Sequence, residues 1–264
     1  MKTLRVRDNT PIAYEAGGHG SPVLLVHGTS EDHRTWRLVR PALEDHFRVY
    51  AMDRRGHGGS GDTGTYRFED EWADIAAVIE AIGGPVDVVG HSFGGTCALE
   101  ATRLTTHVRR LVLYEPPMPF GRRFWPTALG GRMQALLDAG RPEEALMLFL
   151  REIIQMPAVD LDTARGSPSW STRVATAHTI PRELQSLDTY GIDYASLRAL
   201  SVPTLLLLGG ATLPSLKTET EQLQGLLPNS RVAVMAGQGH VAMRTAPEVL
   251  AREIIQFFTV DLDP

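Results

Sequence analysis

Short apolar runs alternate with amphipathic stretches along the first 117 residues of the chain. Residues 22–26 form a continuous apolar run, which is typical of a strand buried on both faces of a parallel sheet. Residues 68–82 place their apolar side chains at helical spacing and stop at Gly83-Gly84-Pro85. Further strands are predicted at residues 47–52, 86–89 and 108–114. This alternation predicts a mainly parallel sheet with right-handed helical crossovers.

The N-terminal residues have a different pattern. Residues 4–6 and 12–16 alternate apolar and polar side chains, and the turn-forming cluster Asp8-Asn9-Thr10-Pro11 joins them. This arrangement predicts an antiparallel hairpin at one edge of the sheet.

Strand-like runs disappear between residues 118 and 200, where amphipathic segments take over. Helices are predicted there at residues 132–139, 143–155, 172–178 and 182–190. The sheet resumes at residues 202–209, and the last predicted strand and helix are 231–235 and 247–258. The sequence therefore predicts a core domain formed by residues 1–117 and 201–264, with residues 118–200 inserted as a helical cap, or lid.

Composition and charge limit the kinds of molecule that this protein is expected to bind. The chain has 264 residues, a formal net charge of −5 and an isoelectric point near 6, which gives no electrostatic basis for binding nucleic acid or an anionic membrane. No apolar run approaches the roughly 18 residues of a membrane span, and residues 1–7 lack the apolar core of a signal peptide. We therefore expect a cytoplasmic protein. Cys97, the single cysteine, is expected to be a buried and inert thiol. The oligomeric state stays open, with a homodimer as one option.

The stretch Gly90-His91-Ser92-Phe93-Gly94 has the pattern G-x-S-x-G between a predicted strand and a predicted helix. That context is typical of a nucleophile elbow, a sharp turn that exposes the serine hydroxyl. The amide of Phe93 then lies at a helix N-terminus, where it can face a negative charge that develops beside Ser92. The alternative is a glycine-rich and serine-rich loop without a catalytic role.

Two further stretches supply partners for Ser92. Thr29 follows the buried strand 22–26 and a glycine that allows close backbone approach, so its amide is the candidate for a second oxyanion donor. His240 lies in a glycine-flanked loop after the last predicted strand and is the expected general base. A plain turn is the alternative reading of the loop that contains Thr29.

The glycine-rich stretch 53–61 lacks the spacing of nucleotide-binding loops, so we interpret it as structural. Its Arg54-Arg55 pair is expected on a solvated face or in local ion pairs. No organic cofactor and no metal ion is implied by the sequence.

Taken in order, these motifs resemble the α/β-hydrolase family over nearly the full chain. The resemblance implies an eight-stranded, mostly parallel sheet, a helical cap after the sixth strand, and a catalytic serine, acid and histidine in that chain order. Many members carry the acid after the seventh strand, but residues 209–214 contain no carboxylate. A subset carries it after the sixth strand, where Glu115 stands. We therefore predict a triad of Ser92, Glu115 and His240, with a helix-capping role as the alternative for Glu115.

A narrower likeness concerns the substrate. The stretch Tyr114-Glu115-Pro116-Pro117, the loop 210–214 and the stretch Pro168-Ser169-Trp170 are similar to segments of fungal zearalenone lactone hydrolases. This likeness implies that Trp170 is a substrate-contacting wall of the pocket.

Together these features predict a serine hydrolase that cleaves a small-molecule carboxylic ester or lactone through an acyl-enzyme, with a macrolactone such as zearalenone among the candidate substrates. The alternatives are a cofactor-free perhydrolase of the haloperoxidase type, a carbon–carbon bond hydrolase, and a hydrolase-like ligand receptor without catalysis.

Overall fold

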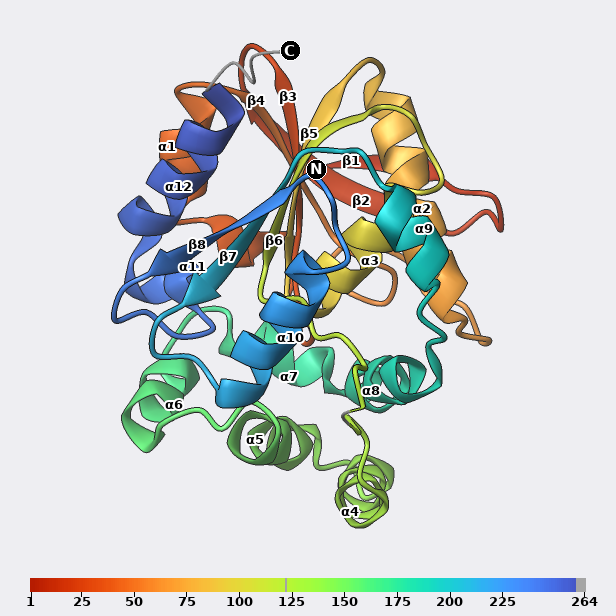
Figure 1. Ribbon diagram of the computed structural model, residues 1–264. Coiled ribbons are helices and arrows are strands. Elements are labelled where there is room, and N and C mark those ends of the chain that lie inside the picture. Colours follow the sequence, from red (N-terminus) through yellow and green to blue (C-terminus); the bar gives the residue numbers. More distant parts are fainter. Residues whose placement is uncertain (122, 260–264) are drawn as a thin grey trace.

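A computed structural model describes residues 1–121 and 123–259 and places eight strands in one sheet (Figure 1). The strands are β1 Lys2–Arg5, β2 Pro11–Gly18, β3 Pro22–Val26, β4 Arg48–Met52, β5 Val86–His91, β6 Val108–Tyr114, β7 Thr204–Gly209 and β8 Ser230–Met235. Their order is β1-β2-β4-β3-β5-β6-β7-β8. The pairs β1–β2 and β2–β4 are antiparallel and all other pairs are parallel. The predicted α/β-hydrolase sheet and its edge hairpin are confirmed.

Helices cover both faces of the sheet. One face carries α1 (Arg40–Glu44) and α12 (Pro247–Thr259), and the other carries α2 (Phe68–Ile82), α3 (Phe93–Ala101) and α10 (Pro214–Gln224) (Figure 1). A buried apolar cluster lies on each side of the strands. Burial on both sides explains why the central strands are continuous apolar runs rather than alternating ones. Two short helices, η1 (His33–Trp36) and α11 (Ala242–Thr245), complete the core.

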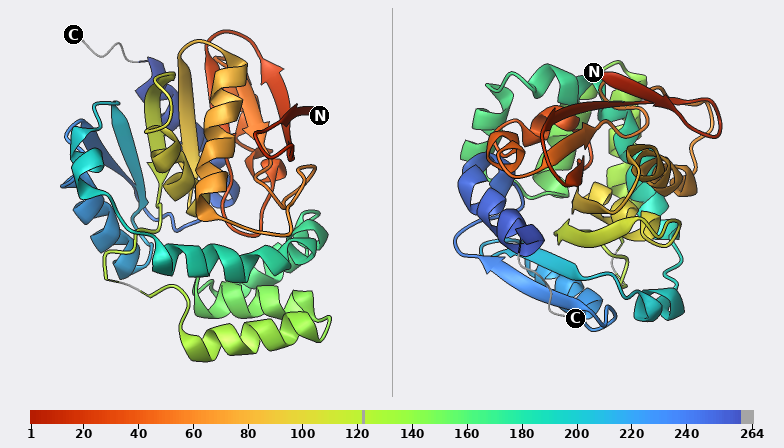
Figure 2. Two further views of the ribbon diagram at one scale, coloured as in Figure 1. Left: turned by 90° about the vertical axis from the view of Figure 1, so that its right-hand side faces the viewer. Right: turned by 90° about the horizontal axis from the view of Figure 1, so that it is seen from above.

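The segment between β6 and β7 is helical and lies across the carboxyl ends of the parallel strands (Figure 2, left). Its helices are α4 Thr127–Asp138, α5 Pro142–Glu152, α6 Ala158–Arg165, α7 Trp170–Ala175, η2 Ala177–Thr179, α8 Ile180–Thr189 and α9 Tyr194–Ala199. The predicted insertion of helices after the sixth strand is confirmed. The domain bounds at residues 117, 118 and 200 stay a prediction, and residues 260–264 of the predicted core domain lie outside the described part of the chain.

The helices α6 and α9 were not predicted from the sequence. They span eight and six residues and bury only Leu161 and Ala164 in one case and Leu197 in the other. So few apolar positions give no measurable helical period. Within the described residues, no helix is long and apolar enough to cross a membrane.

The sheet hydrogen bonds continue one residue beyond the end of β5 and one residue beyond the end of β6. The amide of Ser92 donates to the carbonyl of Tyr114 at 2.9 Å, and the amide of Glu115 donates to the carbonyl of Leu207 at 3.2 Å. Ser92 and Glu115 are therefore fixed by sheet hydrogen bonds at the same edge, beneath the cap.

Candidate active site

Ser92 occupies a strained turn between β5 and α3. Its backbone has φ 51° and ψ −131°, in a region that favours glycine, and the residue as a whole is 9% exposed. The turn is possible because neighbouring backbones approach closely. A Cβ on Gly94 would overlap the carbonyl oxygen of His27, and one on Gly90 would lie 2.6 Å from the Cα of Gly95. The glycines of the motif are thus needed where β3, β5 and α3 meet.

Glu115 contacts His240. The Nδ1 atom of His240 lies 2.6 Å from Oε2 of Glu115, whose side chain is fully buried. The same carboxylate accepts hydrogen bonds from the amide of Gly209 at 2.7 Å and from the hydroxyl of Thr212 at 2.9 Å. The last residue of β7 and the loop that follows it, which lack a carboxylate, therefore contribute two donors to the acid supplied after β6. The structure thus brings together two of the three residues of the predicted triad.

Two aromatic residues at the edge of the sheet hold the backbone of the loop that contains His240. Nε2 of His91 donates to the carbonyl of His240 at 2.9 Å, and the hydroxyl of Tyr114 donates to the carbonyl of Gly239. Burial, together with the positive charge that His240 can carry, lowers the pKa of His91 to about 3. His91 is therefore neutral near pH 7 and acts as a hydrogen-bond donor, which leaves His240 as the candidate base beside Ser92.

Ser92 and His240 line one cavity together with Thr29 and Phe93. The remaining lining residues are all apolar; they are Pro117, Phe124, Phe149, Ile153, Ile154, Leu184, Leu187, Leu213 and Leu216. No charged side chain is among these lining residues, so the cavity matches the apolar part of a neutral molecule.

The two residues predicted to supply the oxyanion donors both lie close to Ser92. Phe93 is the first residue of α3, so its amide has no acceptor within the helix. The loop after β3 lies directly against the serine, because a Cβ on Gly28 would be 3.1 Å from the Cβ of Ser92. Thr29 follows at once and lines the cavity. This arrangement allows both amides to face a charge that develops on a substrate carbonyl beside Ser92.

Trp170 is not brought to this cavity. It begins α7, and its indole nitrogen donates to Oε1 of Glu143 at 3.0 Å, away from the residues that line the cavity. The apolar faces of α5 and α8 supply the cap's wall instead. The sequence carried a signal for part of this wall, since Leu184 and Leu187 are three residues apart on the apolar face of a predicted helix.

A separate buried cluster contains Asp32, His33 and Asp53, whose donor atoms lie within 4.8 Å of one another. These are residue types that could hold a metal ion. Their atoms are already engaged, because Asp53 accepts from the amide and Nδ1 of His33 and from the amide of Gly59, while Asp32 pairs with Arg34. We interpret the cluster as structural, because its hydrogen bonds hold the loop after β4 in place.

The comparison with known proteins agrees with this geometry. The sequence model of the "Alpha/beta hydrolase family" matches residues 23–253. The chain belongs to this family. It is 27% identical to N-formylmaleamate deformylase of Pseudomonas putida over 85% of this chain and 84% of that protein. It is 26% identical to the pimeloyl-[acyl-carrier protein] methyl ester esterase of Nitrosomonas europaea over 90% of this chain and 95% of that protein.

A solved structure extends the likeness. An alpha/beta hydrolase from Sphaerobacter thermophilus superposes with a TM-score of 0.86 at 34% identity, covering 98% of this chain and all of that one. The protein is therefore a hydrolase of the alpha/beta hydrolase family. The narrower likeness to zearalenone lactone hydrolases gains no support from these relatives.

Proposed function

We propose that this family member is a serine esterase that cleaves neutral, apolar carboxylic esters through an acyl-enzyme on Ser92. The observation that carries the proposal is the 2.6 Å contact between Glu115 and His240, formed at the cavity that His240 shares with Ser92. A serine hydroxyl is a weak nucleophile near neutral pH and needs a nearby base, and a histidine oriented by a carboxylate is such a base.

In the proposed reaction, Oγ of Ser92 attacks the ester carbonyl while His240 accepts the hydroxyl proton. The amides of Thr29 and Phe93 bind the oxyanion, and each such donor is worth about 10²-fold or more in rate. His240 then protonates the departing alkoxide, which leaves as the alcohol. A water molecule, deprotonated by the same histidine, attacks the acyl-enzyme, and collapse of the second tetrahedral intermediate returns the proton to Ser92 and releases the carboxylic acid.

The absence of charged residues from the described cavity lining supports neutral substrates over anionic ones. An ester with a carboxylate on its acyl chain would lose hydration there without gaining an ionic partner. A lactone would react by the same steps and would give a single hydroxy acid, since its alcohol stays attached. A macrolactone such as zearalenone is the most specific substrate that this proposal includes.

A substrate panel tests the proposal. We expect p-nitrophenyl butyrate and hexanoate to turn over many times per protein, and the matched half-ester p-nitrophenyl succinate to have a kcat/KM at least tenfold lower. γ-Lactones, a resorcylic macrolactone and a ring-cleavage diketone complete the panel and separate lactonase and carbon–carbon hydrolase activity from esterase activity. The proposal fails if no ester is turned over, or if Ser92→Ala retains more than about a thousandth of wild-type hydrolysis.

A further inference from the structure

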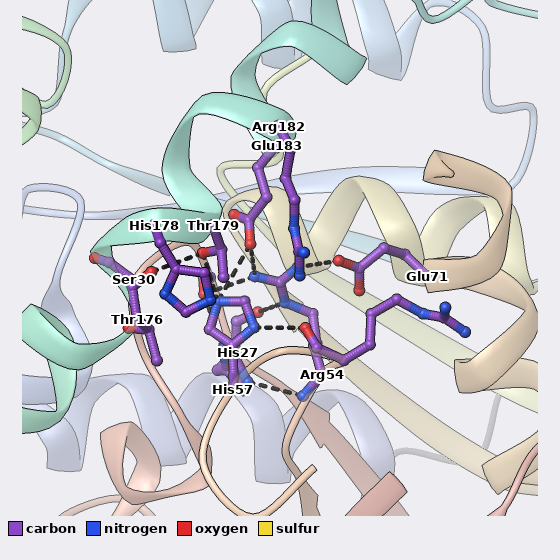
Figure 3. A network of polar contacts seen from close by, with 12 residues as sticks. His27, Ser30, Arg54, His57, Glu71, Thr176, His178, Thr179, Arg182 and Glu183 are labelled. Carbon is purple, nitrogen blue, oxygen red and sulfur yellow. Dashed lines mark hydrogen bonds and ion pairs between the residues drawn. The ribbon is translucent and has the colours of Figure 1, made fainter. Parts of the chain in front are cut away.

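Arg54, at the start of the loop after β4, holds the backbone of the loop that carries Thr29 (Figure 3). Its guanidinium is fully buried. Nε donates to the carbonyl of His27 at 3.0 Å, and Nη2 donates to the carbonyl of Gly28 at 3.1 Å. The guanidinium also lies 4.8 Å from the centre of the Phe93 ring. One arginine therefore contacts the surroundings of both proposed oxyanion donors.

The contact with Gly28 sets the direction of the Thr29 amide. In a trans peptide the carbonyl of one residue and the N–H of the next point in opposite directions. Two donors fix the Gly28 carbonyl, since Nδ1 of His27 also donates to it at 2.8 Å. With the carbonyl turned toward Arg54 and His27, the N–H of Thr29 is turned away from them.

The cap holds the other side of the guanidinium. Glu183 of α8 accepts from Nη2 of Arg54 at 2.9 Å, and its side chain is fully buried. Nη2 thus bridges a cap carboxylate and the Gly28 carbonyl. Burial alone would raise the pKa of Glu183, but the charge of Arg54 and the hydrogen bond from His57 lower it, so the group is ionised.

A second carboxylate, which belongs to the core domain, also pairs with the charge of Arg54. Glu71 of α2 accepts from Nη1 at 3.0 Å. The buried cation is therefore shared between one carboxylate that belongs to the core and one that arrives with the cap. If the cap carboxylate is lost, the guanidinium is drawn toward Glu71, and the Nη2 contact that orients the Gly28–Thr29 peptide weakens.

We propose that Glu183 is a positioning residue that acts through Arg54, so that docking of the cap fixes the Thr29 amide for oxyanion binding. This inference rests on the proposed serine mechanism. It assigns to the cap a part in the chemical step, in addition to its part in forming the apolar wall of the cavity.

The variant Glu183→Gln tests the inference, with Glu144→Gln as the matched control. Glu144 is also a cap carboxylate paired with an arginine, but that pair is exposed and distant from the loop of Thr29. Activity is measured per active site, counted by fluorophosphonate labelling of Ser92, which removes the effect of misfolded protein. We expect Glu183→Gln to lower kcat about ten- to a hundredfold with KM changed less than threefold, and Glu144→Gln to leave both unchanged.

A transition-state analogue provides the readout that a merely structural residue would not change. An alkyl trifluoromethyl ketone forms a hemiketal with Ser92 whose oxyanion needs the same two amides. Its inhibition constant should rise in Glu183→Gln by the same factor by which kcat/KM falls. The inference is overturned if kcat per titrated site and this inhibition constant both match the wild type, whatever the change in Tm. Should Glu183→Gln not fold, Glu183→Asp, which keeps the charge but shortens its reach, takes its place.

Crystal structures separate this inference from the proposed function. If the wild type hydrolyses no ester, the proposed function fails, but the orientation of the Gly28–Thr29 peptide can still be compared between wild type and Glu183→Gln. A rotated peptide in the variant supports the positioning role, and an unchanged peptide overturns it.

Discussion

Ser92 and Glu115 are both non-glycine residues with positive φ angles, 51° and 47°. Each such conformation costs about 1–3 kcal/mol and persists only where surrounding contacts hold it. For Ser92 those contacts are the close glycine backbones, and for Glu115 they are the hydrogen bonds from Gly209, Thr212 and His240. Two of the strained positions among the described residues therefore belong to the proposed triad.

The variant Glu115→Gln should lower kcat about 10⁴-fold. An amide cannot accept hydrogen bonds from Nδ1 of His240 and from the other two donors of Glu115 with the same geometry. The wrong tautomer of the His240 imidazole is then favoured. Steady-state kinetics on p-nitrophenyl butyrate measure the effect. Glu221→Gln, which alters an exposed carboxylate of α10, serves as the control and should behave as wild type. A value of kcat for Glu115→Gln within threefold of the wild type would mean that another residue is the acid.

The sequence predicts Ser92 and its partner His240 because local motifs mark them: glycines around a serine, and glycine before a histidine after a strand. It could not predict the environment of Arg54, for which a solvated face or a local ion pair was expected. The carboxylates that bind it lie 17 and 129 residues away, so the fully buried cluster exists only once cap and core are packed. Cys97 is buried as expected, and burial raises the pKa of its thiol well above the usual value.

Among the elements, the crossover helices and parallel strands of the core could be predicted closely. The bounds of α2 and β6 agree with the sequence pattern because a long apolar period or run is ended by glycine, proline or a charged turn. The cap was predictable only in outline. Its helices are short, and the residues that face the cavity cannot be told from those that fill the cap's own core, as the prediction for Trp170 shows.

The close contact between α3 and the end of β3 predicts how a substitution at Gly94 changes stability and activity. Gly94→Ala places a methyl group against the carbonyl of His27, so α3 must move away from β3. We expect a loss of about 1–3 kcal/mol in the free energy of unfolding and a large fall in kcat, as Ser92 and Thr29 separate. Gly131→Ala is the control, because nothing lies within 4 Å of its added Cβ on α4 and the change should stabilise by about 0.5–1 kcal/mol. Urea unfolding measures both; equal stabilities would contradict the packing described.

For the whole molecule, the decisive feature is that cap and core share one buried ionic cluster. Arg54 comes from the core, Glu183 comes from the cap, and His57 lies 3.2 Å from Glu183. A buried charge left without its partner is costly, so cap and core should unfold together rather than separately. Figure 3 shows how the cluster lies between the loop after β4 and α8.

This cluster predicts a pH dependence of stability. The folded-state pKa of Glu183 lies below its ordinary value of 4.5, so its contribution is fully present above about pH 4.5 and is lost as the pH falls further. The difference in the free energy of unfolding between wild type and Glu183→Gln should therefore be constant from pH 7 to pH 5 and shrink toward pH 3. Urea titrations at each pH measure it. A difference that is the same at pH 7 and pH 3 would show that folding does not lower the pKa of Glu183.

The acyl-enzyme on Ser92 can be detected by acid-quenching the enzyme during turnover of p-nitrophenyl butyrate and locating the acyl group by peptide mass spectrometry. We expect a butyryl group on Ser92 that forms and decays at least as fast as kcat, and no such adduct in Ser92→Ala. Turnover with no acyl group on Ser92, together with undiminished hydrolysis by Ser92→Ala, would contradict this expectation.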